Sequence, residues 1–269
     1  MAHTSGPMDD PAAPTASREW TRLQGWGAAV TGTLLVLSWL ISPLRAGWDS
    51  LDRALFWAAN HSLGYQTIWD GLWALSNHRL FDLVGAVCMA GIFAWSGRQQ
   101  GQAGGFSLLS RALIGALVGL TAQALIHELI SMKRASPALV FTDAQRLSEL
   151  IPWIKSKDAS KGSFPGDHGL VLLTLSFYGW GYLTRKARWA AAGAVVVFSL
   201  PRVMSGAHWP TDIFVGFVSL ALIAMGLYCG LGLNRPINRH IQPLLVRLIE
   251  SFCPNPLRRW LKPRGRQRI

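Results

Sequence analysis

Long apolar stretches separated by short polar segments dominate the chain. Residues 23–44 and 213–234 each run free of charge for the length of about 20 residues that crosses the hydrocarbon core of a bilayer. Four further stretches have shorter uncharged cores: 83–97, 112–127, 169–184 and 189–201. Each of these four needs polar residues at one end to complete a span, and such ends must face protein or water. The pattern predicts an all-α, polytopic membrane protein with a bundle of six transmembrane helices.

The segments outside the spans have distinct compositions. Residues 48–77 mix Trp and Phe with Asp and Arg, which is typical of an amphipathic helical segment at the membrane interface. Residues 1–22 form a leader rich in Pro, Ala, Ser and Thr, which predicts a flexible segment. We expect one membrane domain over residues 23–234, followed by a basic tail over residues 235–269.

Composition supports a membrane protein and excludes other classes. Of 269 residues, 50% are hydrophobic and 15% are charged, which excludes a disordered chain and argues against a soluble globule. The net charge is +12, but nine basic residues follow Asn234 against one acid, Glu250. The excess therefore lies in one tail and does not form a nucleic-acid-binding face. No nucleic-acid partner is expected.

The basic loops predict the orientation. With six spans, Arg98 and Arg111, residues 185–188 and the tail fall on one face, which the positive-inside rule makes cytoplasmic. Both termini then lie in the cytoplasm. The segment 128–168 on the opposite face is also basic, which weakens this orientation unless its charges have another purpose.

Cofactor and metal motifs are missing from the sequence. Cys88, Cys229 and Cys253 show no zinc or disulfide spacing, and no phosphate-binding glycine loop occurs. Acidic residues are too few and scattered for a two-metal site. We expect chemistry without a metal or cofactor. The pattern says nothing about the oligomeric state.

Three short stretches on the non-cytoplasmic face contain most residues able to do chemistry: 133–137, 163–168 and 202–212. His168 follows Pro165 and Gly166, which predicts a place in the first turn of a helix. Helix N-termini favour phosphate, and a histidine there can attack phosphorus and carry it covalently. The alternative is an interfacial histidine that only bonds a neighbour.

His208 and Asp212 are four positions apart, so their side chains can meet on one helical face. A carboxylate on one ring nitrogen would set the tautomer and leave the other nitrogen to protonate the leaving oxygen and later act as base. The alternative is that Asp212 is merely an acidic residue in the first turn of a helix.

Cationic donors for a phosphoryl group are supplied by Lys133, Arg134 and Arg202. Contact with lipid headgroups is the competing interpretation, and it is weakest for Arg202, which ends an apolar run. Asp167 could cap the helix that follows, bond Ser163 or Lys161, or position an acceptor.

These residues resemble the motifs of the membrane-bound type 2 phosphatidic acid phosphatase superfamily. Its third motif, Arg, five residues, His, three residues and Asp, is matched by Arg202, His208 and Asp212. Its second motif ends in the nucleophilic His and is matched by residues 165–168. The resemblance implies catalytic roles for His168, His208 and Asp212 in a six-helix bundle of the superfamily kind.

Two motifs depart from the superfamily pattern. Gly166 and Asp167 stand where Ser-Gly is usual, and Pro201 stands where Ser precedes the arginine. The first motif, Lys, six residues, Arg-Pro, is broken, because Arg134 precedes Ala-Ser-Pro. Lys133 is the substitute for the missing lysine. The resemblance assigns Lys133, Arg134, Arg202, Gly166 and Asp167 to phosphate binding.

Six shorter runs are similar to one branch of the superfamily, the inner-membrane phosphotransferases of Gram-negative bacteria that act on lipid A: 133–137, 141–143, 157–160, 163–169, 201–204 and 206–209. Residues 77–82 resemble this branch more faintly. This resemblance implies transfer of the distal phosphate of undecaprenyl diphosphate to the 1-phosphate of lipid A at the periplasmic face, through a phosphohistidine. Ser163, Lys157 and Lys161 become possible headgroup contacts, and Lys155 lies beside them, although a solvated loop is equally consistent.

Two alternatives stay open. The first is a lipid-phosphate hydrolase of the same superfamily, acting on undecaprenyl diphosphate, phosphatidylglycerophosphate or lipid A. The second is a non-enzymatic membrane protein or a transporter. The transporter is disfavoured because the reactive residues cluster at one end of the spans and not at mid-depth.

Overall fold

The computed structural model describes residues 20–100, 104–129, 134–165 and 167–261. Every regular element in this part of the chain is a helix, which confirms the all-α prediction. In chain order the elements are α1 (Arg22–Leu40), α2 (Ser42–Asn60), α3 (Thr67–Ser76), α4 (Leu80–Gln99), α5 (Gly104–Leu129), α6 (Pro137–Val140), α7 (Leu147–Leu150), α8 (Asp167–Gly179), α9 (Arg185–Met204), η2 (Asp212–Phe217, a π-helical segment), α10 (Val218–Gly230), α11 (Asn234–Pro236), η3 (Ile237–Ile241), α12 (Gln242–Phe252) and α13 (Asn255–Leu261).

Five helices in the described ranges are long and apolar enough to cross a membrane: α1, α4, residues Gly104–Ile126 of α5, α9, and η2 together with α10. The sixth predicted span, 169–184, forms the shorter α8, which ends at Gly179. Its 13 residues extend about 20 Å at 1.5 Å per residue, which is less than the hydrocarbon core of about 30 Å. The chain is therefore a multi-pass membrane protein with five candidate spans and one shorter apolar helix.

Two predicted span boundaries are wrong. The first span was expected to continue to Leu44, but α1 ends at Leu40 and α2 begins at Ser42 with a proline in its first turn. Proline has no N–H to donate and clashes with the preceding turn, so it starts a new helix. The last span was expected to reach Asn234, but α10 ends at Gly230. Gly232 follows with a φ of 77°, a conformation that glycine adopts at helix ends.

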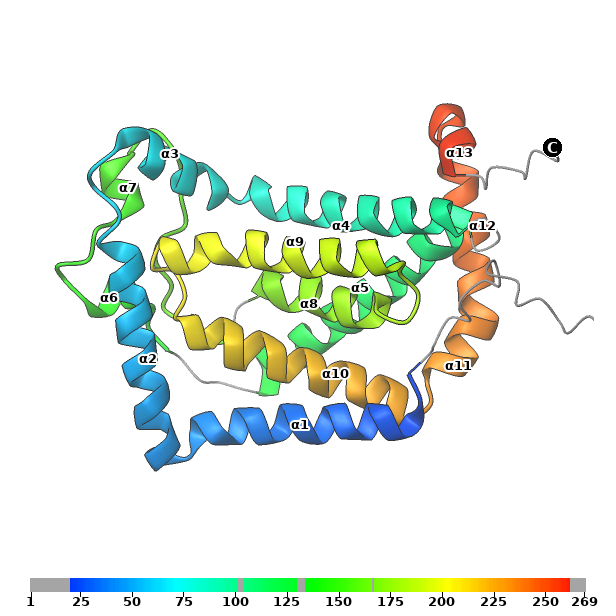
Figure 1. Ribbon diagram of the computed structural model, residues 1–269, viewed down its shortest axis with the longest axis horizontal. Helices are drawn as coiled ribbons and strands as arrows, with labels where there is room; N and C mark the ends of the chain where they lie inside the picture. The colour runs from blue at the N-terminus through cyan, green and yellow to red at the C-terminus, as the bar shows by residue number, and fades with distance from the viewer. Residues whose placement is uncertain (1–19, 101–103, 130–133, 166, 262–269) are drawn as a thin grey trace, which may run out of the picture.

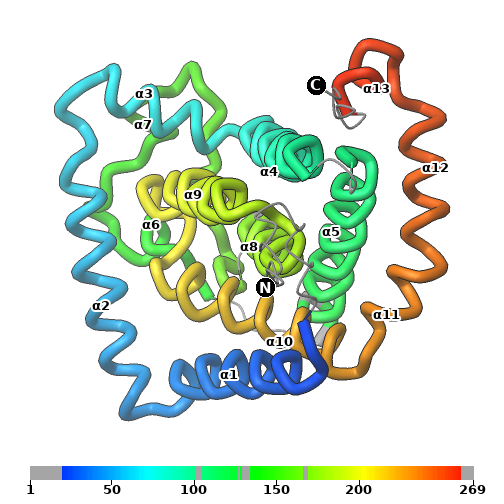
Figure 2. The backbone as a smooth tube through the Cα atoms, turned by 45° about the vertical axis from the view of Figure 1, so that its right-hand side comes forward, coloured from blue at the N-terminus to red at the C-terminus, as the bar shows by residue number. Residues whose placement is uncertain are grey.

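The short helix α8 lies inside the bundle. Figure 2 shows α4, α5, α9 and α10 around it, and α8 contacts all four. Leu170, Leu172, Leu175 and Tyr178 on α8 are buried. Because protein surrounds this helix, its backbone need not extend across the lipid to be satisfied.

The helices α2, α3, α6 and α7 gather at one end of the bundle, which we call the loop end (Figure 1). Helices α1 and α9 run toward this end, and α4, α8 and α10 start from it. Helices α12 and α13 lie at the opposite end. The connections between spans at the loop end are therefore the ones that contain the predicted reactive residues.

The predicted amphipathic segment forms α2 and α3. Helix α2 runs across the bundle at a steep angle to α1 (Figure 1). Asp52, Phe56 and Asn60 form one buried face of α2 at four-residue intervals, while Leu51 and Leu55 on other faces are exposed. Two of the three buried side chains, Asp52 and Asn60, are polar, so this face of α2 packs against polar groups at the loop end as well as against apolar ones.

The described part of the predicted basic tail is folded against the bundle. Helix α12 packs on α5, and α13 contacts α4 and α5. Leu261 of α13 is buried with Ala94 and Phe106. The Arg98 guanidinium lies 4.8 Å from the ring centroid of Trp260, within the range of a cation–π contact. Residues 235–261 thus close the end of the bundle opposite the loop end.

Helix α8 begins in very close contact with η2, and this contact depends on Gly169. A Cβ atom at this position would overlap the ring of Phe217, which is itself buried. We therefore expect Gly169→Ala to lower the free energy of unfolding by about 1–3 kcal/mol, the usual effect of overpacking. Gly91→Ala is the matched control, because a Cβ there meets no atom within 4 Å and alanine favours the helix. Denaturant titration of both variants in detergent measures the difference; equal stability would contradict the close contact.

Candidate active site

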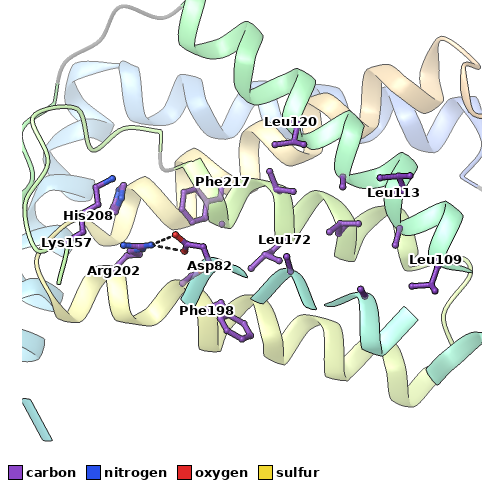
Figure 3. A pocket seen from close by; sticks show the side chains of 18 of the residues that line it. Asp82, Leu109, Leu113, Leu120, Lys157, Leu172, Phe198, Arg202, His208 and Phe217 are labelled. Carbon is purple, nitrogen blue, oxygen red and sulfur yellow. Dashed lines mark hydrogen bonds and ion pairs between the residues drawn. The ribbon is translucent and has the colours of Figure 1, made fainter. Parts of the chain in front are cut away.

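The three stretches singled out in the sequence meet at the loop end. Arg202 lies in the last turn of α9, His208 lies in the turn that follows, and Asp212 begins η2. His168 lies in the first turn of α8, as predicted, and Gly169 beside it lines the same cavity as Arg202 and His208. Lys157 approaches from the loop between α7 and α8. Figure 3 shows Lys157, Arg202 and His208 gathered at one end of this cavity.

The cavity is an apolar groove of about 560 Å³ with a polar end. Its polar lining comes mainly from Asp82, Lys157, Arg202 and His208. The remainder is mostly aliphatic or aromatic: Ala86, Ala90, Leu109, Ala112, Leu113, Ala116, Leu120, Val171, Leu172, Leu175, Phe198, Phe217 and Ile249. In Figure 3 Leu109 and Leu113 lie at the end away from Arg202. A charged headgroup attached to an apolar chain matches this division.

The groove is open on the side of α5. Leu113 and Leu120 line it and are also exposed on the outer surface of the bundle. Both residues belong to a candidate membrane span. A molecule with an apolar tail could therefore enter sideways from the bilayer and bring only its polar head to the loop end.

Arg202 is held by two residues that sequence reasoning did not assign to the site. Its Nη2 donates to both carboxylate oxygens of Asp82, at 2.7 and 2.8 Å, and its Nη1 donates to Asn77 Oδ1 at 2.8 Å. Such a bidentate pair fixes the plane of the guanidinium. The only sequence signal was a faint resemblance of residues 77–82 to the lipid A branch, without a role for either residue.

The hydrogen bond predicted between His208 and Asp212 is replaced by another contact. The Nδ1 atom of His208 lies 2.8 Å from the carbonyl oxygen of Ser163 and 3.7 Å from Asp212 Oδ2. Because a carbonyl can only accept, Nδ1 carries the proton and Nε2 is the nitrogen that can exchange one. Asp212 is still near enough to stabilise a positive charge on the imidazole. The carbonyl therefore sets the tautomer, and the carboxylate acts electrostatically.

Asp212 instead binds its own backbone turn and Arg134. Its Oδ2 accepts from the Trp209 backbone N–H at 2.8 Å, and its Oδ1 accepts from Arg134 Nη1 at 2.7 Å. In the first contact the carboxylate bonds the N–H of the residue three positions earlier, as the acid of a capping box does. Asp212 and His208 are thus close, with Oδ2 and Nδ1 3.7 Å apart, but they do not form a hydrogen bond.

Arg134 joins two buried carboxylates. Its Nη2 donates to Asp52 Oδ2 at 2.6 Å, and its Nη1 also donates to Thr211 Oγ1 at 2.9 Å. Asp52 accepts in turn from the backbone N–H and the hydroxyl of Thr211, at 2.8 and 2.6 Å. We call Asp52, Arg134, Thr211 and Asp212 the buried ionic cluster. It joins α2 and the segment after α5 to the start of η2.

Aromatic rings enclose the cluster. The Arg134 guanidinium lies 5.3 Å from the ring centroid of Trp39 and 4.9 Å from that of Trp209. Trp39 also stacks on Phe164, with centroids 4.4 Å apart. Burial raises the pKa of the Asp52 carboxyl above its ordinary value, while the hydrogen bonds from Thr211 and Arg134 oppose that rise. Because Arg134 donates to Asp212 and Asp52, it holds the start of η2 against α2.

The remaining predicted site residues fall into three groups. Lys133 and Gly166 lie outside the described residues, and for His168 and Asp167 only the backbone position in α8 is described. Ser163 is buried and contributes its carbonyl to His208. Lys157 lines the groove, whereas Lys161 is exposed on the same loop.

Comparisons with known proteins identify relatives of this chain. The model of the PAP2 superfamily matches residues 112–235, a range that includes Arg134, His168 and residues 202–212. Over 196 residues the chain is 38% identical to lipid A 1-diphosphate synthase of Escherichia coli (strain K12). The aligned region covers 73% of this chain and 82% of that protein. No solved structure matches the chain. These matches confirm the resemblance found in the motifs.

Proposed function

This chain belongs to the PAP2 superfamily, and from that premise we propose that it transfers the distal phosphate of undecaprenyl diphosphate to the 1-phosphate of lipid A. The products are undecaprenyl phosphate and lipid A 1-diphosphate. The observation that carries the proposal is the groove, because it joins an apolar channel open to the bilayer to a cationic end beside His168 and His208.

In the first half-reaction, an imidazole nitrogen of His168 attacks the distal phosphorus, and the bond from phosphorus to the bridging oxygen breaks. His208, protonated on Nε2, gives that proton to the leaving oxygen. Arg202 and Lys157 offset the charge of the transferred group, which spreads over three equatorial oxygens. Asp82 and Asn77 hold the Arg202 guanidinium in its plane, which makes them positioning residues.

In the second half-reaction, an oxygen of the lipid A 1-phosphate attacks the phosphohistidine, and the nitrogen–phosphorus bond breaks. His208 is now neutral and takes up the proton of the acceptor phosphate on Nε2, which restores the starting state. The Ser163 carbonyl keeps Nδ1 protonated throughout, and Asp212 at 3.7 Å stabilises the imidazolium in the first step. An anionic phosphate acceptor needs less help from a base than water does.

The arrangement supports a place in the bacterial inner membrane with the loop end in the periplasm. The end opposite the loop end contains Arg98, Arg185, Lys186 and the helices α12 and α13. By the positive-inside rule we propose that this end faces the cytoplasm. In this arrangement α8 is the sixth member of the bundle, enclosed by α4, α5, α9 and α10. The acceptor and the donor would both approach in the outer leaflet.

A labelling experiment tests the reaction. The purified full chain is incubated in detergent with lipid A and with undecaprenyl diphosphate that carries ³²P in its distal phosphate. We expect label in lipid A. Label released mainly as free phosphate would establish the hydrolase instead, and unreacted donor would remove both enzymatic assignments.

A further inference from the structure

A second hollow lies beside the active site at the loop end, and Lys157 is the one of its lining residues to which the proposed reaction gives a role. Its volume is about 600 Å³. It lies between residues 78–79, just before α4, the start of α7, and residues 155–159 in the loop that follows α7. Its lining residues are His78, Arg79, Arg146, Ser148, Lys155, Ser156, Lys157, Asp158 and Ala159. We call it the basic hollow.

The hollow has an excess of positive charge. Four of its residues are Lys or Arg, and Asp158 is the one acid among its lining residues. Asp158 is buried and already engaged, because it accepts from Arg146 Nη2 at 3.2 Å and from the Ser148 backbone N–H at 2.8 Å. The ion pairs among described residues do not include Arg79, Lys155 or Lys157. These three exposed cations therefore line the hollow without an ion pair to any carboxylate in the described part of the chain.

Polar atoms in the wall also lack partners. Ser156 Oγ and Arg146 Nε are buried and make no hydrogen bond with any described residue. An unmade hydrogen bond at a buried donor costs free energy, so a ligand that draws these side chains toward it would recover that cost. Phosphate oxygens accept several such bonds at once.

The basic hollow is connected to the active site by backbone and side-chain contacts. Lys157 lines both the hollow and the apolar groove. Asn77 donates to the Lys157 carbonyl, and the Lys157 N–H donates to the Asn77 carbonyl at 3.3 Å. The same Asn77 accepts from Arg202. A ligand in the hollow is thus held at a fixed position relative to the guanidinium that faces the reacting phosphate.

We infer that the basic hollow binds a second phosphate of the acceptor, on the part of its saccharide headgroup remote from the reacting phosphate. This inference rests on the proposed function. The donor is excluded as the occupant because its two phosphates are adjacent in one diphosphate, and both belong at the polar end of the groove. A disaccharide with a phosphate at each end presents one phosphate to Arg202 and the other to Arg79 and Lys155.

The test compares two acceptors and two variants. Lipid A with a phosphate at both ends of its disaccharide is compared with the same lipid that has only the 1-phosphate, each with labelled undecaprenyl diphosphate. The variant Arg79→Gln/Lys155→Gln removes two charges that face the hollow. Lys186→Gln is the control, because Lys186 is an exposed cation at the start of α9, at the far end of the bundle.

For the wild type we expect a KM about tenfold lower for the acceptor with two phosphates. In the double variant this difference disappears, while kcat and the KM for the donor stay unchanged. Lys186→Gln behaves as the wild type. The inference is overturned if the wild type shows no preference between the two acceptors. It is also overturned if the double variant raises the KM for both acceptors equally, and a bilayer phospholipid is then the better occupant of the hollow. A wild type that transfers no label at all overturns the proposed function itself.

Discussion

Replacing His168 by alanine is expected to abolish both transfer and hydrolysis, with a loss on the order of 10³-fold or more in kcat, because the covalent route no longer exists. His168 lies in the first turn of α8, and its neighbour Gly169 lines the groove beside Arg202 and His208. His208, which lines the groove, is the residue that we propose for proton transfer. Release of label from the ³²P donor measures the loss.

Trapping the intermediate separates the roles of the two histidines. With donor but no acceptor, the wild type is expected to accumulate protein-bound ³²P that is labile in acid and stable in base, as a phosphohistidine is. His168→Ala should carry no label. His208→Gln should still become labelled, only more slowly, because it lacks the proton donor for the leaving oxygen.

The matched control is His240→Ala, which removes an exposed imidazole in η3 at the opposite end of the bundle. It should label and turn over as the wild type does. Label retained in His168→Ala, or lost in His240→Ala, would assign the nucleophile to another residue and would end the proposed mechanism.

Replacing Asp52 by alanine should destabilise the fold more than other substitutions on α2. Asp52 accepts three hydrogen bonds from Thr211 and Arg134, and its side chain is only 1% exposed. Its removal leaves Arg134 Nη2 with only the more distant and half-exposed carboxylate of Asp49, at 3.6 Å. Breaking one side of a buried ion pair typically costs about 3–5 kcal/mol. Denaturant titration in detergent measures the loss in the free energy of unfolding.

Asp49 on the same helix provides the control. Its carboxylate lies 3.6 Å from Arg134 Nη2 and 2.9 Å from Arg45 Nε, but its side chain is 40% exposed. Exposed ion pairs contribute about 0–1 kcal/mol, so Asp49→Ala should change the stability little. If the two variants lose the same stability, the buried ionic cluster does not hold α2 to η2. Asp52→Asn should fall between them, because it keeps the shape and part of the hydrogen bonding.

The two arginines of the site pair with carboxylates in different places, with different consequences for phosphate binding. Asp82 pairs with Arg202 inside the groove, where a substrate phosphate must share or displace it. Asp52 and Asp212 pair with Arg134 in the buried ionic cluster, behind His208. We therefore propose that Arg202 meets the substrate phosphate and that Arg134 holds the turn that contains His208.

Sequence patterns predicted the elements of this protein well where the signal was local. Two charge-free runs of spanning length and three shorter ones marked the five candidate spans, and Pro165 and Gly166 marked the start of α8. The spacing of Arg202, His208 and Asp212 predicted a site at one end of the bundle, and the structure places all three residues at the loop end. The family was also evident from these motifs, because the chemistry needs those residue types at those intervals.

Contacts between distant segments left no such signal. Asp82 and Arg202 are separated by 120 residues, and Asp52 and Arg134 by 82. Neither pair has a periodicity or a spacing that a single sequence could reveal. The error at His208 and Asp212 has a local cause: His208 lies in the turn before the helix, so the interval between the two residues is not helical, and the carboxylate accepts from the Trp209 N–H.

By itself the sequence determined that the chain crosses a membrane with helices, that its reactive side chains share one end, and that phosphate is the group they suit. Hydrophobic length and residue spacing are properties of the chain alone, so they can be read without coordinates. Only the tertiary structure decided that α8 is an enclosed short helix, that Asp82 orients Arg202, and that the Ser163 carbonyl orients His208. Those outcomes depend on which polar groups find partners when separate helices pack, because a buried group takes whichever partner the fold brings within hydrogen-bond distance.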